Sequence, residues 1–113
     1  MHLRELQRLM RDFEMERGWD RFPASLTYVH LLEELGEIGE HILFKEGYKK
    51  AGLGHREPLG NVDREFAQAL SLLLQLSNSF NVDLEDAFQK EYRVMEGRFD
   101  KEAWRNYMEK YGR

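Results

Sequence analysis

Residues 65–76, EFAQALSLLLQL, limit the choice of fold more than any other part of the chain. On a helix with 3.6 residues per turn, the apolar side chains from Phe66 to Leu76 point to nearly every side. Only Gln68, Ser71 and Gln75 form a narrow polar seam. A helix that is apolar almost all round is buried, so other helices must cover it. Because the 113 residues also include only two prolines and few β-branched side chains, we expect an all-α protein, a compact helical bundle of four to five helices.

The rest of the chain supplies helices that can surround this segment. The predicted helices are residues 3–17, ended by Gly18; about 25–44, with Ser25 as N-cap; about 61–80, starting near Asn61 or Asp63; 84–97, capped by Asp83; and a short helix capped by Asp100. Residues 45–60 are rich in glycine and basic side chains and are predicted to form a loop between the second and third helices. No Pro/Gly/Ser-rich linker divides the chain, which predicts a single domain, 1–113.

Charge and composition exclude several kinds of partner. The net charge is −4, whereas a surface for a nucleic-acid polymer needs clustered Lys and Arg. The chain has no cysteine, which excludes disulfides and thiolate metal sites. No apolar run approaches the roughly 18 residues of a membrane span, and the N-terminus has no apolar signal core. These features predict a cytoplasmic protein without a membrane partner.

The segment LLEELGEIGEHIL, residues 31–43, concentrates acidic side chains on one side of its predicted helix. One arc of about 120° holds His30, Glu33, Glu34, Glu37, Glu40 and His41. Leucine and isoleucine fill the opposite side. Two interpretations are open: the arc is the solvated back of an amphipathic helix, or it is a cluster that holds a cation. Repulsion between like charges three and four residues apart favours the second interpretation.

The two glycines in this segment, Gly36 and Gly39, each cost roughly 1 kcal/mol relative to alanine inside a helix. Their presence predicts that another helix or a ligand approaches closely there.

Glu65 offers a partner for the acidic arc. On its helix it lies within about 40° of Ala69 and Leu72, so its carboxylate points in a largely buried direction. A buried carboxylate needs a partner, and a cation shared with Glu33, Glu34 and Glu37 would serve. Alternatively, Glu65 reaches solvent from the first turn and interacts favourably with the helix dipole. Carboxylates from two helices are hard oxygen ligands, the type that Mg²⁺ or Mn²⁺ prefers.

The order and spacing of these motifs resemble a known family. The chain has EELGE (Glu33, Glu34, Glu37), then a basic loop, EFAQ (Glu65, Gln68) and LSNSFNVDLEDAF. This pattern is similar to the EExxE and ExxD motifs of the MazG-like all-α nucleoside triphosphate pyrophosphohydrolases. The similarity covers roughly residues 19–99 and includes the upstream WD and the PASLTYVHLLEELGEIGE run.

The resemblance implies a Mg²⁺-dependent hydrolase, with Mn²⁺ as the alternative ion, that cleaves a non-canonical or deoxynucleoside triphosphate to monophosphate and pyrophosphate. It implies Glu33, Glu34, Glu37 and Glu65 as metal ligands, with Glu34 and Glu37 at the catalytic centre. Divalent ions can polarise the attacking water and neutralise charge on phosphate oxygens. Basic residues of the fourth helix are candidates for phosphate contacts: Lys90, Arg93 and Arg98. A homodimer or homotetramer is also implied, as expected from the large apolar surface and the late aromatics.

Two positions depart from the family pattern. Gln68 stands where the family has the Asp of ExxD, and an amide offers a carbonyl oxygen but no negative charge. Met95 occupies the nearest register to an Asn that many members carry. An alternative is therefore a catalytically impaired nucleotide- or metal-binding regulatory module. A third interpretation is a helical oligomerisation domain whose glutamates are solvated.

Overall fold

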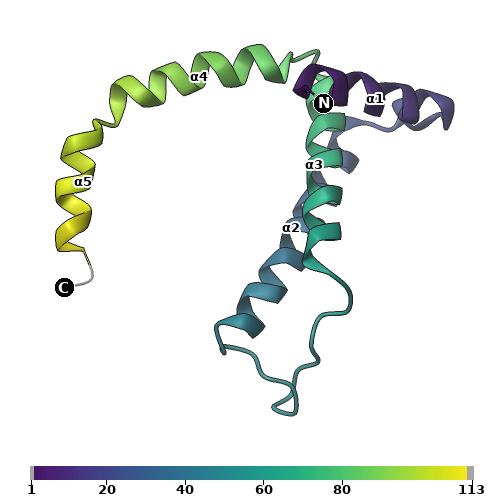
Figure 1. The fold of residues 1–113 in the computed structure, drawn as a ribbon. Helices are drawn as coiled ribbons and strands as arrows, with labels where there is room; N and C mark the ends of the chain where they lie inside the picture. The colour runs from purple at the N-terminus through teal and green to yellow at the C-terminus, as the bar shows by residue number, and fades with distance from the viewer. Residues whose placement is uncertain (1, 112–113) are drawn as a thin grey trace.

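The structure, a computed structural model, describes residues 2–111 and is helical over most of that range (Figure 1). Its elements are α1 (Leu3–Glu16), the 3₁₀ helix η1 (Trp19–Arg21), α2 (Ala24–Lys45), α3 (Val62–Ser79), α4 (Leu84–Arg98) and α5 (Lys101–Lys110). Within the described residues there is no β-strand, only an isolated bridge between Ala51 and His55. The predicted all-α fold class is confirmed.

Helices α2 and α3 form an antiparallel hairpin that contains most of the core, and α1 packs across one end of α3 (Figure 1). The buried apolar residues are Ile38 on α2 and Ala69, Leu72 and Leu74 on α3. The connection between the two helices is the predicted glycine-rich segment, in which Gly47, Gly52, Gly54 and Gly60 adopt positive φ. Such backbone angles favour glycine, so this segment cannot continue either helix.

Helices α4 and α5, residues 84–110, extend from the end of α3 as an arm, and we use that name below (Figure 1). Helix α4 contacts α1 near its start, and most residues of the arm are exposed. The radius of gyration is 18.6 Å, whereas a compact chain of this length has about 13 Å. Compact packing is therefore confined to α1, α2 and α3.

Two of the three predicted N-caps, Asp83 and Asp100, are confirmed, and Asn61, one of the two predicted starts of the third helix, caps α3. Asn61, Asp83 and Asp100 each accept a hydrogen bond from a backbone N–H in the first turn of α3, α4 and α5. The predicted N-cap Ser25 is wrong. Helix α2 begins at Ala24 after the extended Pro23, and proline can precede a helix without loss of a required donor. Ser25 therefore lies within the first turn.

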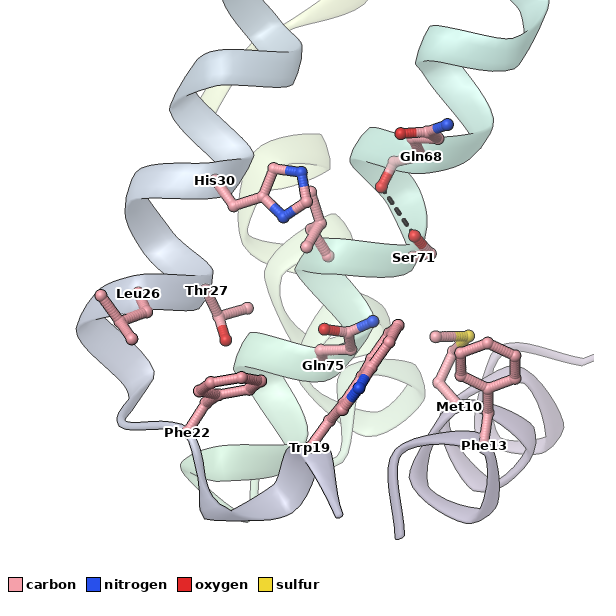
Figure 2. A pocket seen from close by; sticks show the side chains of 11 residues that line it. Met10, Phe13, Trp19, Phe22, Leu26, Thr27, His30, Gln68, Ser71 and Gln75 are labelled. Atoms are coloured by element: carbon pink, nitrogen blue, oxygen red, sulfur yellow. Dashed lines mark hydrogen bonds between the residues drawn. The ribbon is translucent and has the colours of Figure 1, made fainter. Parts of the chain in front are cut away.

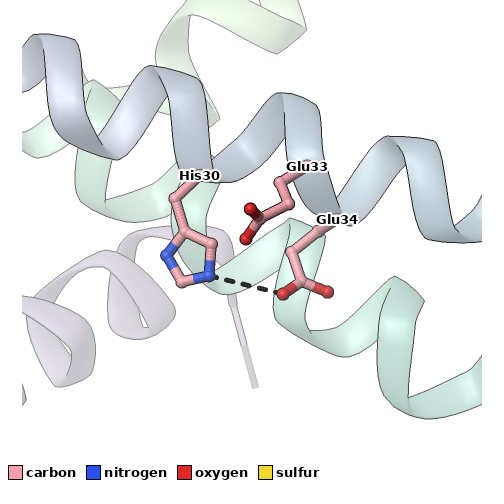
Figure 3. A group of neighbouring side chains, drawn as sticks. All are labelled: His30, Glu33 and Glu34. Carbon is pink, nitrogen blue, oxygen red and sulfur yellow. Dashed lines mark ion pairs between the residues drawn. The ribbon is translucent and has the colours of Figure 1, made fainter.

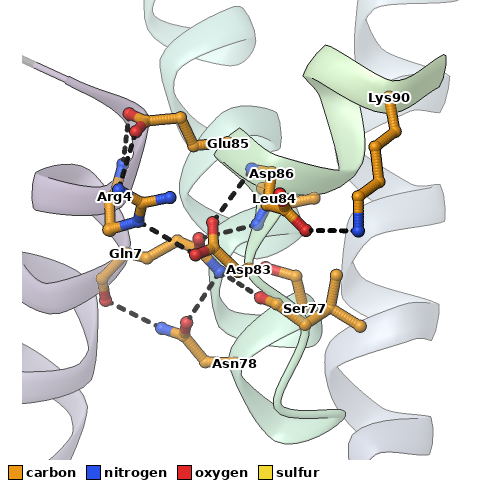
Figure 4. Close-up of polar contacts among 10 residues, drawn as sticks. Arg4, Gln7, Ser77, Asn78, Asp83, Leu84, Glu85, Asp86 and Lys90 are labelled. Atoms are coloured by element: carbon orange, nitrogen blue, oxygen red, sulfur yellow. Dashed lines mark hydrogen bonds and ion pairs between the residues drawn. The ribbon is translucent and has the colours of Figure 1, made fainter.

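A buried hydrogen-bond network around Gln7 joins α1, the end of α3 and the start of α4 (Figure 4). The Gln7 side-chain amide donates to the Val82 carbonyl at 2.7 Å and lies 3.1 Å from acceptors on Ser77 and Asn78. Its carbonyl accepts from the Leu84 N–H at 2.9 Å, and Asn78 donates to the Gln7 backbone carbonyl at 2.8 Å. The direction in which α4 leaves α3 is thus fixed by specific contacts.

Arg4 reinforces this connection from the surface. Its guanidinium lies 2.9 Å from the Asp83 carboxylate and 3.0 Å from that of Glu85. A hydrogen bond from the Asp86 N–H, together with Arg4, lowers the pKa of the Asp83 carboxyl. Arg4 and Gln7 together hold the first turn of the arm against α1.

Helix α2 packs through the edge of its predicted apolar side, so that Ile38 on that side is buried and the acidic Glu34 beside it is buried as well. Glu34 is only 6% exposed, whereas Leu35, on the predicted core side, is 47% exposed. The prediction of close approach at Gly36 and Gly39 also fails within the chain, because a Cβ added at either glycine meets no atom within 4 Å. Helix α3 covers only one strip of α2, so much of its apolar side remains without a partner.

Among the described helices, none is both long and apolar enough to cross a membrane.

Candidate metal centre and adjoining pocket

His30, Glu33 and Glu34 bring ligand atoms together on one side of α2 (Figure 3). One ligand atom from each side chain lies within 4.8 Å of those of the other two. The α-helix creates this arrangement, because residues three and four positions apart lie one turn apart on the same face. His30 Nε2 lies 3.3 Å from Glu34 Oε1. An imidazole nitrogen and two carboxylates form a set of donors that can hold a divalent cation.

Glu37 lies one turn further along the same face and experiences the field of its neighbours. Repulsion from Glu34 is the main reason that the pKa of the Glu37 carboxyl is raised, with smaller contributions from partial desolvation, Glu65 and Glu33. Glu37 is therefore close enough to the other three predicted ligands to be repelled by them. A cation between them would remove this repulsion.

Glu65 projects from α3 towards α2 and meets a second histidine. His41 Nε2 lies 2.8 Å from Glu65 Oε2, but the approach lacks hydrogen-bond geometry. Both atoms are buried and have no hydrogen-bond partner. A buried carboxylate oxygen without a hydrogen bond costs free energy, which a shared proton or cation would reduce. The prediction that Glu65 points in a buried direction is confirmed.

The donor set along α2 and α3 fits a divalent cation. Below, the term acidic cluster means Glu33, Glu34, Glu37 and Glu65, with His30 at one end and His41 at the other. Three features favour a bound cation: Glu34 is buried, a Glu65 oxygen has no hydrogen-bond partner, and the pKa of Glu37 is raised. Glu40 is less suited to bind a cation, because Lys49 Nζ already pairs with it at 3.0 Å.

His30 is the ligand candidate that the motif comparison missed. The sequence contained the signal, since His30 lies on the acidic arc, three residues before Glu33 and four before Glu34. A nitrogen ligand changes which metal ions the site prefers. Mg²⁺ and Mn²⁺ favour oxygen ligands, whereas imidazole suits Zn²⁺ and the ions of copper, iron and nickel better.

A pocket of about 690 Å³ opens beside this cluster (Figure 2). At one end stand the rings of Trp19 and Phe22, and at the other lie His30 and Gln68. The remaining lining residues are Met10, Phe13, Leu26, Thr27, Ser71, Leu72 and Gln75. An apolar, aromatic cavity of this size with a few polar groups is typical of sites for small organic ligands. His30 belongs both to the pocket and to the metal-ligating group.

The aromatic end of the pocket is built by the turn between α1 and α2. Gly18 adopts φ 73°, which ends α1 and starts η1. The Trp19 ring then packs edge-on against Phe13 with ring centroids 5.5 Å apart. Trp19 and Phe22 thus form one wall of the pocket.

The remaining predicted site residues lie elsewhere. Gln68 lines the pocket, one turn after Glu65 on α3. Lys90, Arg93 and Arg98 lie on the arm, which leads away from α2, and a single chain does not bring them to the acidic cluster (Figure 1). Lys90 instead pairs with Asp86 at 3.0 Å. Arg98 lies over the Phe99 ring at 4.7 Å.

Fold and site together define an all-helical protein with a histidine and carboxylate cluster beside an aromatic pocket. Comparison with known proteins adds no assignment: no protein-family model matches the chain, and no curated protein or solved structure is significantly similar to it.

Proposed function

We propose that the protein is a divalent-cation-dependent nucleoside triphosphate pyrophosphohydrolase, with Mg²⁺ or Mn²⁺ as cofactor and a non-canonical or deoxynucleotide as substrate. The observation that carries the proposal is the position of His30, which contributes to both the metal-ligating group and the aromatic pocket. A ligand with an aromatic base and a charged, metal-binding tail matches this pair of neighbouring sites.

The residues divide into two roles. Trp19 and Phe22 offer ring faces for base stacking, and the amides of Gln68 and Gln75 can read the polar edge of a base. Glu33, Glu34, Glu37 and Glu65 would hold the cation, and Glu34 and Glu37 would face the reacting phosphate. A bound divalent ion supplies an activated water and neutralises charge on phosphate oxygens. His41, whose Nε2 lies 2.8 Å from Glu65 Oε2, would restrict the position of the Glu65 carboxylate.

A panel of standard, deoxy and modified nucleoside triphosphates, each incubated with Mg²⁺ or Mn²⁺, tests the reaction. We expect pyrophosphate and the corresponding monophosphate from at least one nucleotide, with no product in EDTA and none from Glu34→Gln. Absence of pyrophosphate from every nucleotide with both ions would contradict the proposal.

The pocket has its own test with a matched control, because the chain has two tryptophans. Removing a base-stacking ring costs about 1–3 kcal/mol, which corresponds to roughly a 5- to 150-fold loss of affinity. Trp19→Ala should therefore raise the KM or the Kd for the nucleotide. Trp104→Ala, on the arm, should leave both unchanged. Equal effects of the two variants would exclude the pocket as the base site.

Gln68 supports a second candidate function, a nucleotide- or metal-binding regulatory module without turnover. Its neutral amide stands one turn after Glu65, where the family resemblance implies a carboxylate. This candidate predicts nucleotide binding by calorimetry without product formation, and turnover in Gln68→Asp. We propose a homodimer or homotetramer for either candidate.

A further inference from the structure

Two apolar surfaces of the chain lack a partner. The first, the hairpin face, lies on α2 and α3 and comprises Leu32, Leu35, Ile42, Phe66, Leu70 and Leu73. The second, the arm stripe, lies on α4 and comprises the exposed Phe88, Tyr92 and Met95 together with the half-buried Leu84. Phe66 on the hairpin face and Phe88 on the arm stripe are 57% and 62% exposed. Exposed apolar surface on this scale is typical of an interaction site.

The hairpin face is continuous across both helices. At 100° per residue, Leu35 and Ile42 lie roughly 85° round α2 from the side that packs on α3. Phe66 and Leu73 lie roughly 90° round α3 from the side that packs on α2, in the same rotational sense. Because the helices are antiparallel, both sets emerge on one side of the hairpin. His30 and Gln68 lie on the opposite side, where both line the pocket.

The arm stripe has the spacing of a packing helix. Leu84, Phe88, Tyr92 and Met95 recur at intervals of four and three residues, which places them on one side of α4. Phe88 and Tyr92 stack with ring centroids 6.2 Å apart. An amphipathic helix in water gains most of its stability from packing its apolar side against something. The stripe is about 17 Å long, close to the roughly 15 Å between Leu32 and Ile42 on the hairpin face.

Within one chain these two surfaces cannot meet. The contacts of Gln7 and Arg4 fix the first turn of α4 against α1, and the arm then leads away from α2 and α3 (Figures 1 and 4). Folding the arm back would break a buried network in which Gln7 is only 7% exposed. The surfaces are therefore available to another molecule.

The exposed area indicates how large that contact is. The accessible surface is 9559 Å² for a chain of 13.5 kDa, whereas a compact monomer of that mass exposes about 6,500 Å². The excess is about 3,000 Å² per chain and thus about 6,000 Å² for two chains, at the upper end of the total area that obligate homodimers bury. A face-to-face contact between two hairpins would leave the arm stripe in water, and a contact between two arms would leave the hairpin face exposed.

We propose that two copies of the chain exchange arms, so that the arm stripe of each copy packs on the hairpin face of the other. This arrangement is reciprocal, satisfies two-fold symmetry and covers both surfaces at once. The pocket and the acidic cluster stay open on the other side of the hairpin. The assembly follows from the surfaces alone and does not depend on the proposed hydrolase activity.

Complementation between two variants tests the exchange. Phe88→Glu places a charge on the arm stripe, and Leu70→Lys places one on the hairpin face. Because both side chains are exposed, each variant should keep its helical content by circular dichroism and be monomeric by light scattering. An equimolar mixture should recover a mass of about twice 13.5 kDa, because a mixed dimer has one unaltered contact and one Glu–Lys contact. Gln89→Glu, beside Phe88 but off the stripe, should remain dimeric.

Cross-linking identifies the contact by a second route, and the absence of cysteine makes single-cysteine variants clean. A short bismaleimide added to a mixture of Leu70→Cys and Tyr92→Cys should join the two different chains preferentially. Preferential Leu70→Cys self-linking would instead show a face-to-face dimer and overturn the proposal. A monomeric wild-type chain, or two variants that remain monomeric when mixed, would overturn it as well.

Discussion

Glu34 combines burial with proximity to other ionisable groups, and its effect on cation binding is accordingly the largest we expect from a single residue. Its carboxylate is 6% exposed and has His30 within 3.3 Å. Removing a buried charge usually relieves a desolvation cost, so Glu34→Gln need not destabilise the metal-free fold. The substitution removes a negatively charged oxygen ligand that lies between Glu33 and Glu37. Its effect should therefore appear when a cation is added.

We predict that Mn²⁺ or Mg²⁺ raises the melting temperature of the wild-type protein and that Glu34→Gln abolishes most of this rise. A ligand at 100 times its dissociation constant stabilises the native state by about 2.7 kcal/mol, which corresponds to a shift of several degrees. Differential scanning fluorimetry with metal and with EDTA measures the difference. Glu46→Gln, which removes the same charge at the end of α2, should keep the full response.

The pKa of Glu37 gives a prediction about pH. Repulsion from Glu34 raises this pKa in the folded state, so the folded protein binds the proton more tightly than the unfolded chain. The resulting destabilisation is present above the folded pKa and is relieved as the pH falls through it. In EDTA, Glu37→Gln should therefore raise the melting temperature at pH 7, and the gain should shrink towards pH 4.5. A lower melting temperature than wild type at pH 7 would contradict the assignment.

At the scale of helices, sequence reasoning succeeded where the signal is local. Asp83 and Asp100 cap helices as predicted, because a short polar side chain before a helical run satisfies nearby N–H groups whatever the rest of the fold does. The packed side of α2 was not predictable in this way. Its apolar side is wider than α3 can cover, and only the tertiary arrangement decides that Glu34 is buried while Leu35 is exposed.

The hydrogen-bond network of Gln7 could not be predicted from the sequence, because the partners of Gln7 lie about 70 residues away in the chain. We predict that Gln7→Ala lowers the free energy of unfolding by about 2–4 kcal/mol, since it leaves the Asn78 side-chain oxygen and the Leu84 N–H without the Gln7 side chain as partner. Urea denaturation measures the change. Gln89→Ala, on the exposed side of α4, should change the stability by less than about 0.5 kcal/mol. Equal values for the two variants would show that the network does not hold the arm.

For the molecule as a whole, the helix content was predictable and the extended shape was not. The near-complete apolar surface of residues 66–76 predicted burial, yet Leu70 and Leu73 are each 44% exposed. A sequence records that an apolar side must be covered without recording whether the cover comes from the same chain. The candidate site shows the same contrast between local and tertiary features. The positions of the α2 carboxylates could be predicted from helical spacing, whereas the pocket could not, because it depends on how α1 and η1 pack against α3.

If a second copy covers these surfaces, the stability of the fold depends on protein concentration. Folding coupled to association follows mass action, so each tenfold increase in concentration should raise the melting temperature measurably. We predict a rise between 1 and 100 µM for the wild-type chain and for Gln89→Glu, and a constant melting temperature for Phe88→Glu. Scanning fluorimetry across a dilution series, in EDTA to exclude metal effects, measures it. A wild-type melting temperature independent of concentration, together with a monomeric mass by light scattering, would mean that the 18.6 Å radius of gyration belongs to a chain that is stable alone.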